Sequence, residues 1–565
     1  MKRSFRDTLM LILLIGIQAT FAQAVWKGNI DTDWYTGNAS VAEYTITTPQ
    51  QLAGLAKLVN NGNNFKGKTV KIGANIMLND TTNWENWASK PPANKWTPIG
   101  TKDSMCRFAG IFDGSDHIIS GVYINTASNG QGLFRNIDPN GTIKNLGVIA
   151  SYIKGNFNIG GLVGGYNQGT ISKSHFNGIV TGDTAGVGGL AAFNDGTINS
   201  SYSNSKVTGD TAVGGLVGGN LGTINNSYSN SKVAGNSDIG GLVGTNGGEI
   251  NNSYSTGAAT GDRFVGGLVG LSIKGSINNG YSTGTVTGDR FVGGLVGLNR
   301  EESKINGSYS TGAVTGKTDV GGLVGHNNKS KINKSYSTGV VTGEFAVGGL
   351  VGENREGEIS NSYFTGIVTT EDLIAGGLVG QNNRGKISKS YSIGTVTGNS
   401  HVGGLVGENG GEINNSYFIG TVKGGEFVGG LVGLNYYLIT EDINSIKSMN
   451  NGTITARENV SAGAIIKSYS TGTVTGISKV GGLVGNRPTL LVGRYSTIGY
   501  ADTITDSYYD IETSNKSIHI HSGEGKTTAQ MKQRATFRNW DFDKIWGIKS
   551  TINNGYPYLL ENKGK

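Results

Sequence analysis

Short stretches that could support catalysis occur at two points of this 565-residue chain. Gly280-Tyr-Ser-Thr-Gly284 matches the Gly-x-Ser-x-Gly pattern of a serine nucleophile, which requires a sharp strand-to-helix turn. No helix is expected after it, and related segments carry Ser in place of Gly280. Gly525-Lys-Thr527 is similar to the end of a phosphate-binding loop, but Ile520 stands where the first glycine is required. We therefore expect neither stretch to be catalytic and Thr527 to start a helix.

Metal ligands are equally sparse in the sequence. His519 and His521 would lie on one face of an extended segment and could form half of a metal site, but no third ligand follows nearby. Asp262 and Asp289 occupy equivalent turns, where stacked aspartates could hold calcium, yet the same position holds Lys317 in another copy. A position that accepts lysine is a solvated corner. We predict no metal and no cofactor.

Tyrosine supplies the most regular chemical feature. If the strand around it alternates strictly, Tyr336 shares a face with Lys334 and opposes Ser335 and Ser337, which predicts an external ladder of rings. Such a stripe could stack on sugars or contact a partner protein, and the alternative is a ladder that packs only on itself or in the core. The candidate ligand-binding stripe consists of Tyr202, Tyr228, Tyr254, Tyr281, Tyr309, Tyr336, Tyr363, Tyr391, Tyr417 and Tyr469.

These tyrosines belong to a repeat built around the phrase Gly-Gly-Leu-Val-Gly. Its leucines are spaced by 26 to 28 residues until one doubled gap, and such a period indicates a solenoid in which each unit packs on its neighbours. The leucines are Leu162, Leu190, Leu216, Leu242, Leu268, Leu295, Leu323, Leu350, Leu378, Leu405, Leu431 and Leu483.

Each copy contains three β-prone runs, exemplified by Leu323-Val324, Ile332 to Ser337 and Val340 to Thr342, with Gly and Asn at the turns between them. Three strands per coil predict an all-β, right-handed parallel β-helix with rungs of about 27 residues. Stacked Asn side chains should bond one another at one corner. This corner holds Asn167, Asn194, Asn220, Asn246, Asn299, Asn327, Asn354, Asn382, Asn409 and Asn435, with Ser272 as the exception.

The segments outside the repeats are expected to close the stack. Thr48 and Pro49 begin a predicted helix that ends near Asn60, and we expect the first rung near Thr69. An aromatic tail around Trp540 should plug the last rung's apolar layer. The predicted organisation is a signal peptide (1–24), an N-terminal cap with first rungs (25–100), divergent rungs (101–157), the repeat solenoid (158–486) with an insertion (436–460), and C-terminal rungs with a cap (487–565).

The first 24 residues have the basic start, apolar run and Ala22-Gln23-Ala24 site of a secretory signal, so we expect export to the cell surface or medium, with the periplasm as the alternative. No later stretch is long enough for a transmembrane helix. Removing Lys2, Arg3, Arg6 and Asp7 lowers the net charge from +7 to +5, and the scattered basic residues argue against nucleic-acid binding. Cys106 is the only cysteine, so stability must come from stacking.

The repeated phrase, its period and the preceding Phe108-Ala-Gly-Ile-Phe-Asp-Gly114 segment resemble the GLUG-motif repeat proteins of bacterial surfaces, over about residues 109–485. The resemblance implies an exported, surface-associated repeat module found beside adhesin-like regions and in some immunoglobulin A-cleaving metallopeptidases. Those peptidases depend on a His-Glu-x-x-His zinc helix, which the six histidines here never form. The resemblance therefore does not extend to a protease activity.

Two functions remain as hypotheses. The first is a non-enzymatic, adhesin-like surface or binding rod whose partners are glycans or host or cell-surface proteins. The second is a polysaccharide-acting lyase or hydrolase, which would need carboxylates or basic residues converging from adjacent rungs. Because the charged residues occupy variable turn positions, the sequence favours the first. Ice binding is disfavoured because Lys206, Lys232, Ala313 and Ile367 interrupt the threonine ranks.

Overall fold

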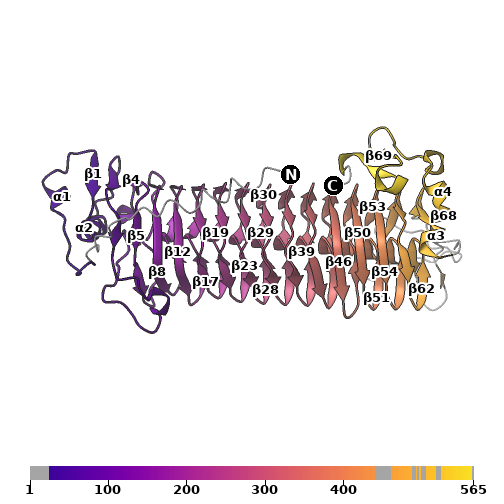
Figure 1. Cartoon of the computed structure of the whole chain (residues 1–565), viewed down its shortest axis with the longest axis horizontal. Helices are drawn as coiled ribbons and strands as arrows, with labels where there is room; N and C mark the ends of the chain where they lie inside the picture. Colours follow the sequence, from indigo (N-terminus) through magenta and orange to yellow (C-terminus); the bar gives the residue numbers. More distant parts are fainter. Residues whose placement is uncertain are drawn as a thin grey trace, which may run out of the picture.

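The computed structural model describes residues 25–439, 460–486, 491–492, 496–497, 504–516 and 523–562. The predicted signal peptide, residues 440–459 of the predicted insertion, and His519 and His521 lie outside the described residues. Within them the chain forms a rod of stacked β-rungs, with the N-terminal segment at one end and the C-terminal segment folded onto the other (Figure 1). Strands of successive rungs pair in parallel, which confirms the predicted β-solenoid.

One rung contains five short strands where the sequence predicted three. They are β38 (Thr318–Gly321), β39 (Val324–Asn328), β40 (Lys331–Asn333), β41 (Tyr336–Ser337) and β42 (Val340–Gly343). The predicted run from Ile332 to Ser337 is divided because Lys334 adopts a left-handed backbone with φ of 49°. The chain turns at that residue, so one long strand becomes two.

The glycines of the repeated phrase allow close backbone packing both within a rung and between neighbouring rungs. A Cβ on Gly325 in β39 would lie 2.6 Å from the backbone of Phe291 and Val292 in the preceding rung's β33 (Arg290–Gly293). A Cβ on Gly321 would lie 2.0 Å from the Val324 carbonyl oxygen. The phrase is therefore glycine-rich because no side chain fits between these strands.

Leucine and asparagine form continuous ladders along the rod. All twelve repeat leucines are fully buried, and consecutive ones are joined by their backbones, as in the bond from Leu323 N to Leu350 O of 2.9 Å. The asparagine ladder is present with side-chain bonds of 2.7–2.9 Å from Asn167 to Asn246 and from Asn299 to Asn435. Ser272 interrupts it as expected and donates to the Ser303 hydroxyl instead.

The doubled gap between repeats is a single rung step. Strand β56 (Val432–Asn435) pairs directly with β63 (Val484–Asn486), and β59 (Ala464–Ile466), β60 (Tyr469–Ser470), β61 (Thr473–Thr475) and β62 (Ser478–Gly481) between them pair with the preceding rung. Only β57 (Tyr437–Ile439) and β58 (Val460–Ala462), which pair antiparallel with each other, lie outside this parallel pairing among the described strands of the rung.

The N-terminal helix follows the prediction closely. Helix α2 spans Pro49–Asn60, and the Thr48 hydroxyl accepts a hydrogen bond from Gln51 N. The stack begins earlier than expected, because β1 (Glu43–Ile46) already pairs in parallel with β2 (Thr69–Ile72). Helix α2 therefore connects β1 to β2, the first two strands of the 16-stranded sheet.

The C-terminal aromatic residues do not cover the last rung's apolar layer, which corrects the predicted plug. Their cluster is separate from the solenoid core and lies on the flank of the rod, while Tyr509 and Ile511 pack at the core's end. The segment contains α4 (Thr528–Met531), whose start at Thr527 is confirmed by a capping box with Gln530, and β69 (Trp546–Gly547) paired with β70 (Tyr558–Leu559). On this flank the Trp546 ring packs against the rings of Tyr417 and Tyr469, with centroids 6.1 and 6.0 Å apart.

Candidate functional site

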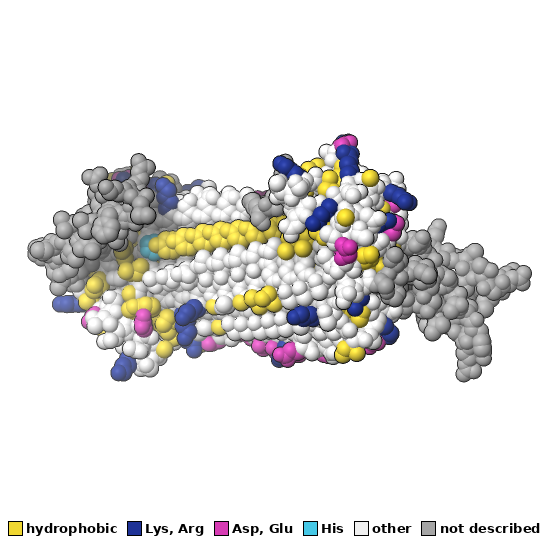
Figure 2. All heavy atoms as spheres, turned by 45° about the vertical axis from the view of Figure 1, so that its right-hand side comes forward, with side chains coloured by type: hydrophobic (Ala, Val, Ile, Leu, Met, Phe, Trp, Pro, Cys, Tyr) yellow, Lys and Arg dark blue, Asp and Glu magenta, His cyan; other side chains and the backbone are white. Residues whose placement is uncertain are grey.

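The ten predicted tyrosines form one continuous column on a face of the rod. Neighbouring rings are stacked with centroids 4.6–5.1 Å apart and planes within 2–10° of parallel. His175 stacks on Tyr202 at one end, and Tyr508 is paired in register with Tyr469 at the other. Figure 2 shows the column as an unbroken apolar stripe with a histidine at its tip.

Only part of this column reaches solvent. The seven tyrosines from Tyr202 to Tyr363 are half-buried, and we call them the open ladder. Tyr391, Tyr417, Tyr469 and Tyr508 are buried beneath the C-terminal segment, and we call them the covered ladder. The sequence could not separate the two, because the covering residues lie far along the chain from most of the tyrosines.

Serine residues fix the direction of the tyrosine side chains. The Ser335 hydroxyl donates to Asn333 O at 2.8 Å and accepts from Ser308 N at 3.2 Å. Ser335 and Ser337 are fully buried on either side of Tyr336. With both neighbours turned inward, the ring between them must point outward.

The open ladder offers ring edges and hydroxyl groups to a partner. Each ring face contacts the ring of the next rung, so the faces are occupied and a sugar cannot stack on them. Burial raises the pKa of Tyr228, Tyr281, Tyr336 and Tyr363 above its ordinary value. These phenols therefore remain neutral near pH 7.

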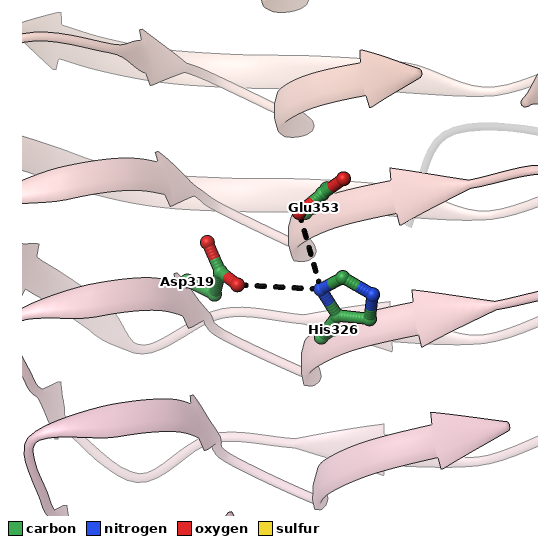
Figure 3. A group of neighbouring side chains, drawn as sticks. All are labelled: Asp319, His326 and Glu353. Atoms are coloured by element: carbon green, nitrogen blue, oxygen red, sulfur yellow. Dashed lines mark hydrogen bonds and ion pairs between the residues drawn. The ribbon is translucent and has the colours of Figure 1, made fainter. Parts of the chain in front are cut away.

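A second cluster, which the sequence analysis missed, joins Asp319, His326 and Glu353 (Figure 3). His326 Nδ1 lies 3.2 Å from Asp319 Oδ2 and 3.3 Å from Glu353 Oε2. The three side chains are 7%, 9% and 14% exposed, respectively. They come from β38, β39 and β44 (Val351–Arg355), so the site spans two adjacent rungs.

The electrostatics of this cluster are dominated by the histidine and its two carboxylates. Burial alone would lower the pKa of His326, but the bonds to Asp319 and Glu353 outweigh it and raise the pKa to about 9. Burial raises the pKa of Asp319, whereas His326 holds the pKa of Glu353 below its usual value against the effect of burial. In the metal-free chain the group is a charged imidazolium between two acids.

This convergence corrects the expectation that charged residues occupy only scattered turns. Two facing columns vary along the rod while the core columns stay constant. One column reads Leu298, His326, Glu353, Gln381, Glu408 in paired register. The other contains Phe291, Asp319, Ala346 and His401, and His401 Nδ1 lies 2.7 Å from Glu408. Aligning the repeats and marking the position three residues after each leucine would have revealed the first column.

Two further candidates of the sequence, Ser282 and Asp289, occupy structural positions in the described rungs. Ser282, in the nucleophile-like stretch, is fully buried, and a Cβ on Gly267 would lie 2.2 Å from its hydroxyl oxygen. Asp289 forms an exposed ion pair of 2.9 Å with Lys317 of the next rung, as expected for a solvated corner.

Comparison with known proteins identifies the repeat. Residues 343–369 and 398–423 match the model of the GLUG motif. The chain carries GLUG-motif repeats. The two matched segments contain Leu350 and Leu405 with their tyrosines Tyr363 and Tyr417 close by, so the motif corresponds to one rung of the rod.

Two relatives share parts of the GLUG-repeat chain. A protein named as a Gly-rich membrane protein of Evansella cellulosilytica is 38% identical over 101 residues, which is 17% of this chain and 10% of that protein. Halomucin of Haloquadratum walsbyi is 30% identical over 174 residues, which is 30% of this chain and 2% of halomucin. The chain thus spans a small fraction of the length of both relatives.

One solved structure that matches is the crystal structure of a Bacteroides ovatus protein for which an immunoglobulin A1 protease activity has been suggested. The match covers 92% of each chain at 16% identity, with a TM-score of 0.18, and carries no argument about function. Within the described residues, no helix is both long and apolar enough to cross a lipid bilayer.

Proposed function

We propose that this GLUG-repeat chain is an exported, non-enzymatic surface or binding rod that contacts a partner protein through the open ladder. The observation that carries the proposal is the unbroken, half-exposed tyrosine column. Six steps of 4.6–5.0 Å place the first and last rings of the open ladder about 29 Å apart. The partial similarity to a protein named as a membrane protein supports a surface location.

A protein partner suits the open ladder better than a glycan does. Sugar recognition by aromatic residues uses ring faces, and these are covered by the neighbouring rings. The covered ladder shows how an aromatic side chain can pack against these tyrosines. The Trp546 ring contacts Tyr417 and Tyr469 with interplanar angles of 48° and 54°. Aromatic side chains of a partner would contact the open ladder in the same tilted geometry.

An apolar patch beside the open ladder extends this surface. Val340, Ile367 and Ile393 are 48%, 47% and 36% exposed. Val340 and Ile367 are paired in register four residues after Tyr336 and Tyr363, and Ile393 follows Tyr391 of the covered ladder by two residues. Ile419, at the equivalent position to Ile393 in the next rung, packs against the C-terminal segment instead. The exposed patch therefore continues a surface that the chain already uses for packing.

The polysaccharide-enzyme hypothesis has one observation in its favour, the convergent Asp319, His326 and Glu353. These side chains are almost fully buried and pair with one another. A carbohydrate chain could not reach them without opening the rung, so we place this hypothesis second.

The proposal is tested with the purified chain immobilised and exposed to arrays of glycans and of surface proteins. Replacing Tyr254, Tyr281 and Tyr309 together by serine should reduce binding to any retained protein by about tenfold or more, because a central aromatic anchor contributes over about 1.4 kcal/mol.

A matched control is replacement of Thr260, Thr287 and Thr315 by serine, since these exposed residues form a parallel column in the same rungs. Equal binding by the tyrosine variant and the unmodified chain would contradict the proposal. Retention of glycans alone would replace the protein partner by a carbohydrate.

A further inference from the structure

The cluster of Asp319, His326 and Glu353 has the composition and spacing of a metal site. Its three donor atoms are one imidazole nitrogen and two carboxylate oxygens, all within 4.8 Å of one another. The separations of 3.2 and 3.3 Å from His326 Nδ1 match the distances of about 3.0–3.5 Å between ligands that bind one cation at about 2.0–2.2 Å.

Hydrogen bonding alone leaves this cluster incompletely satisfied. His326 Nδ1 carries one hydrogen, yet both carboxylates approach that same nitrogen. A divalent cation in place of that hydrogen would neutralise both acids and bind all three donors at once.

The scaffold holds the three donors in place before any cation binds. Each side chain projects from a different strand, and the strands are fixed by pairing of His326 with Glu353 in adjacent rungs. The amide of Asn383 bonds to Glu353, and the Phe291 ring meets the His326 ring edge-on at 5.2 Å. Such outer contacts orient ligands and limit access of water.

We propose that Asp319, His326 and Glu353 bind one divalent transition-metal ion of the zinc type. One nitrogen and two oxygen donors suit Zn²⁺, Mn²⁺, Fe²⁺ or Co²⁺, whereas Ca²⁺ takes oxygen ligands alone. Three protein ligands leave at least one coordination position for another molecule. The ion would also clamp two rungs of the solenoid together.

Zinc binding is measured on the full chain after chelator treatment, by calorimetric titration and by elemental analysis of the bound metal. We expect His326→Leu to remove one zinc equivalent per chain. Glu353→Gln should lower the affinity of this site for zinc by about 10–100-fold or more, because loss of even an outer-shell partner typically costs that much. Co²⁺ added to the unmodified chain should give a visible absorption spectrum that His326→Leu abolishes.

The rod itself supplies variants that fit the fold. Leu298 precedes His326 in the column and Gln381 follows Glu353, so both replacements reproduce a side chain already accommodated one rung away. Cooperative melting by circular dichroism confirms folding. His401→Phe is the control, because Phe427 stands at that position in the following rung and the His401–Glu408 pair offers only two ligands. Absence of zinc binding by the unmodified chain, or retention of the same equivalent in His326→Leu, would overturn the proposal.

Discussion

The open and covered ladders are the same column of tyrosines in two environments. Ring spacing and tilt continue unchanged across the boundary between Tyr363 and Tyr391, where centroids are 5.0 Å apart and planes differ by 3°. What changes is the surroundings, since Tyr363 is half-buried and Tyr391 is only 2% exposed. A regular stack thus provides one geometry, and a separate segment decides which part of it is available to a partner.

Trp546→Ala should have the largest effect, and it should destabilise the covered ladder while leaving the open ladder intact. The indole is fully buried, donates to Asn415 Oδ1 at 3.0 Å and stacks on Trp540 at 4.4 Å. Its loss should destabilise the C-terminal segment by about 3–5 kcal/mol. Hydrogen exchange should increase in residues 527–562 while the rungs of the open ladder stay protected. Phe542→Ala, at the half-buried rim, is the milder control, and uniform deprotection of the whole rod would contradict the distinction.

Alkaline pH should ionise Tyr228, Tyr281, Tyr336 and Tyr363 of the open ladder before it detaches the covering segment from the covered ladder. Burial raises the pKa of Tyr417 and Tyr469 well above its ordinary value of about 10. A raised folded-state pKa contributes stability below pH about 10, and this contribution is lost as the pH rises beyond it. Ultraviolet titration should show a late tyrosine phase that coincides with a change in tryptophan fluorescence. A single early phase for all tyrosines would remove this contrast.

Removing one hydroxyl from each half should give unequal effects. The Tyr469 hydroxyl donates to Pro557 O at 2.6 Å and accepts from Asn553 Nδ2 at 2.9 Å, whereas Tyr254 is half-exposed. Tyr469→Phe should lower the free energy of unfolding by about 1–3 kcal/mol, because it leaves buried polar groups without a partner. Tyr254→Phe should stay within about 0.5 kcal/mol. Denaturant titration compares the two, and equal losses would refute the assignment of environments.

The smallest expected effect concerns the serines beside one tyrosine of the open ladder. Ser335→Ala should destabilise by about 1 kcal/mol, because its hydroxyl bridges two rungs. The buried Ser337 hydroxyl has no hydrogen-bond partner in the described structure, so Ser337→Ala should be neutral or slightly stabilising. Thermal melting of the two variants measures the difference, and a larger loss for Ser337→Ala would show that its hydroxyl is bonded after all.

Much of the fold follows from sequence because each repeat places the same residue at the same point. Leu323 had to be internal and Asn327 had to stack, since every copy repeats them and parallel pairing aligns equivalent positions. The number of strands was missed because the left-handed turn at Lys334 falls on a residue type that gives no signal for it. Simple alternation made an outward Tyr336 one of two possibilities, the other being a ladder packed on itself or in the core, and the structure combines an outward ring with stacking on the neighbouring rungs.

The candidate sites were less accessible to sequence reasoning. Asp319 and His326 are seven residues apart, and Glu353 comes from the next repeat, so their proximity depends on how β38 and β39 pack together. Each residue taken alone looks like ordinary variation at a turn. Only the register between rungs turns that variation into a cluster.

By itself, the sequence determined the repeat, the inward leucines, the asparagine ladder, the capped helix and the column of tyrosines, because local pattern and identical stacking suffice for all of them. The tertiary structure alone decided which tyrosines are covered and which acids meet His326. Both depend on contacts between residues distant along the chain, and no local pattern encodes where the C-terminal segment folds back or which side chains two packed strands bring face to face.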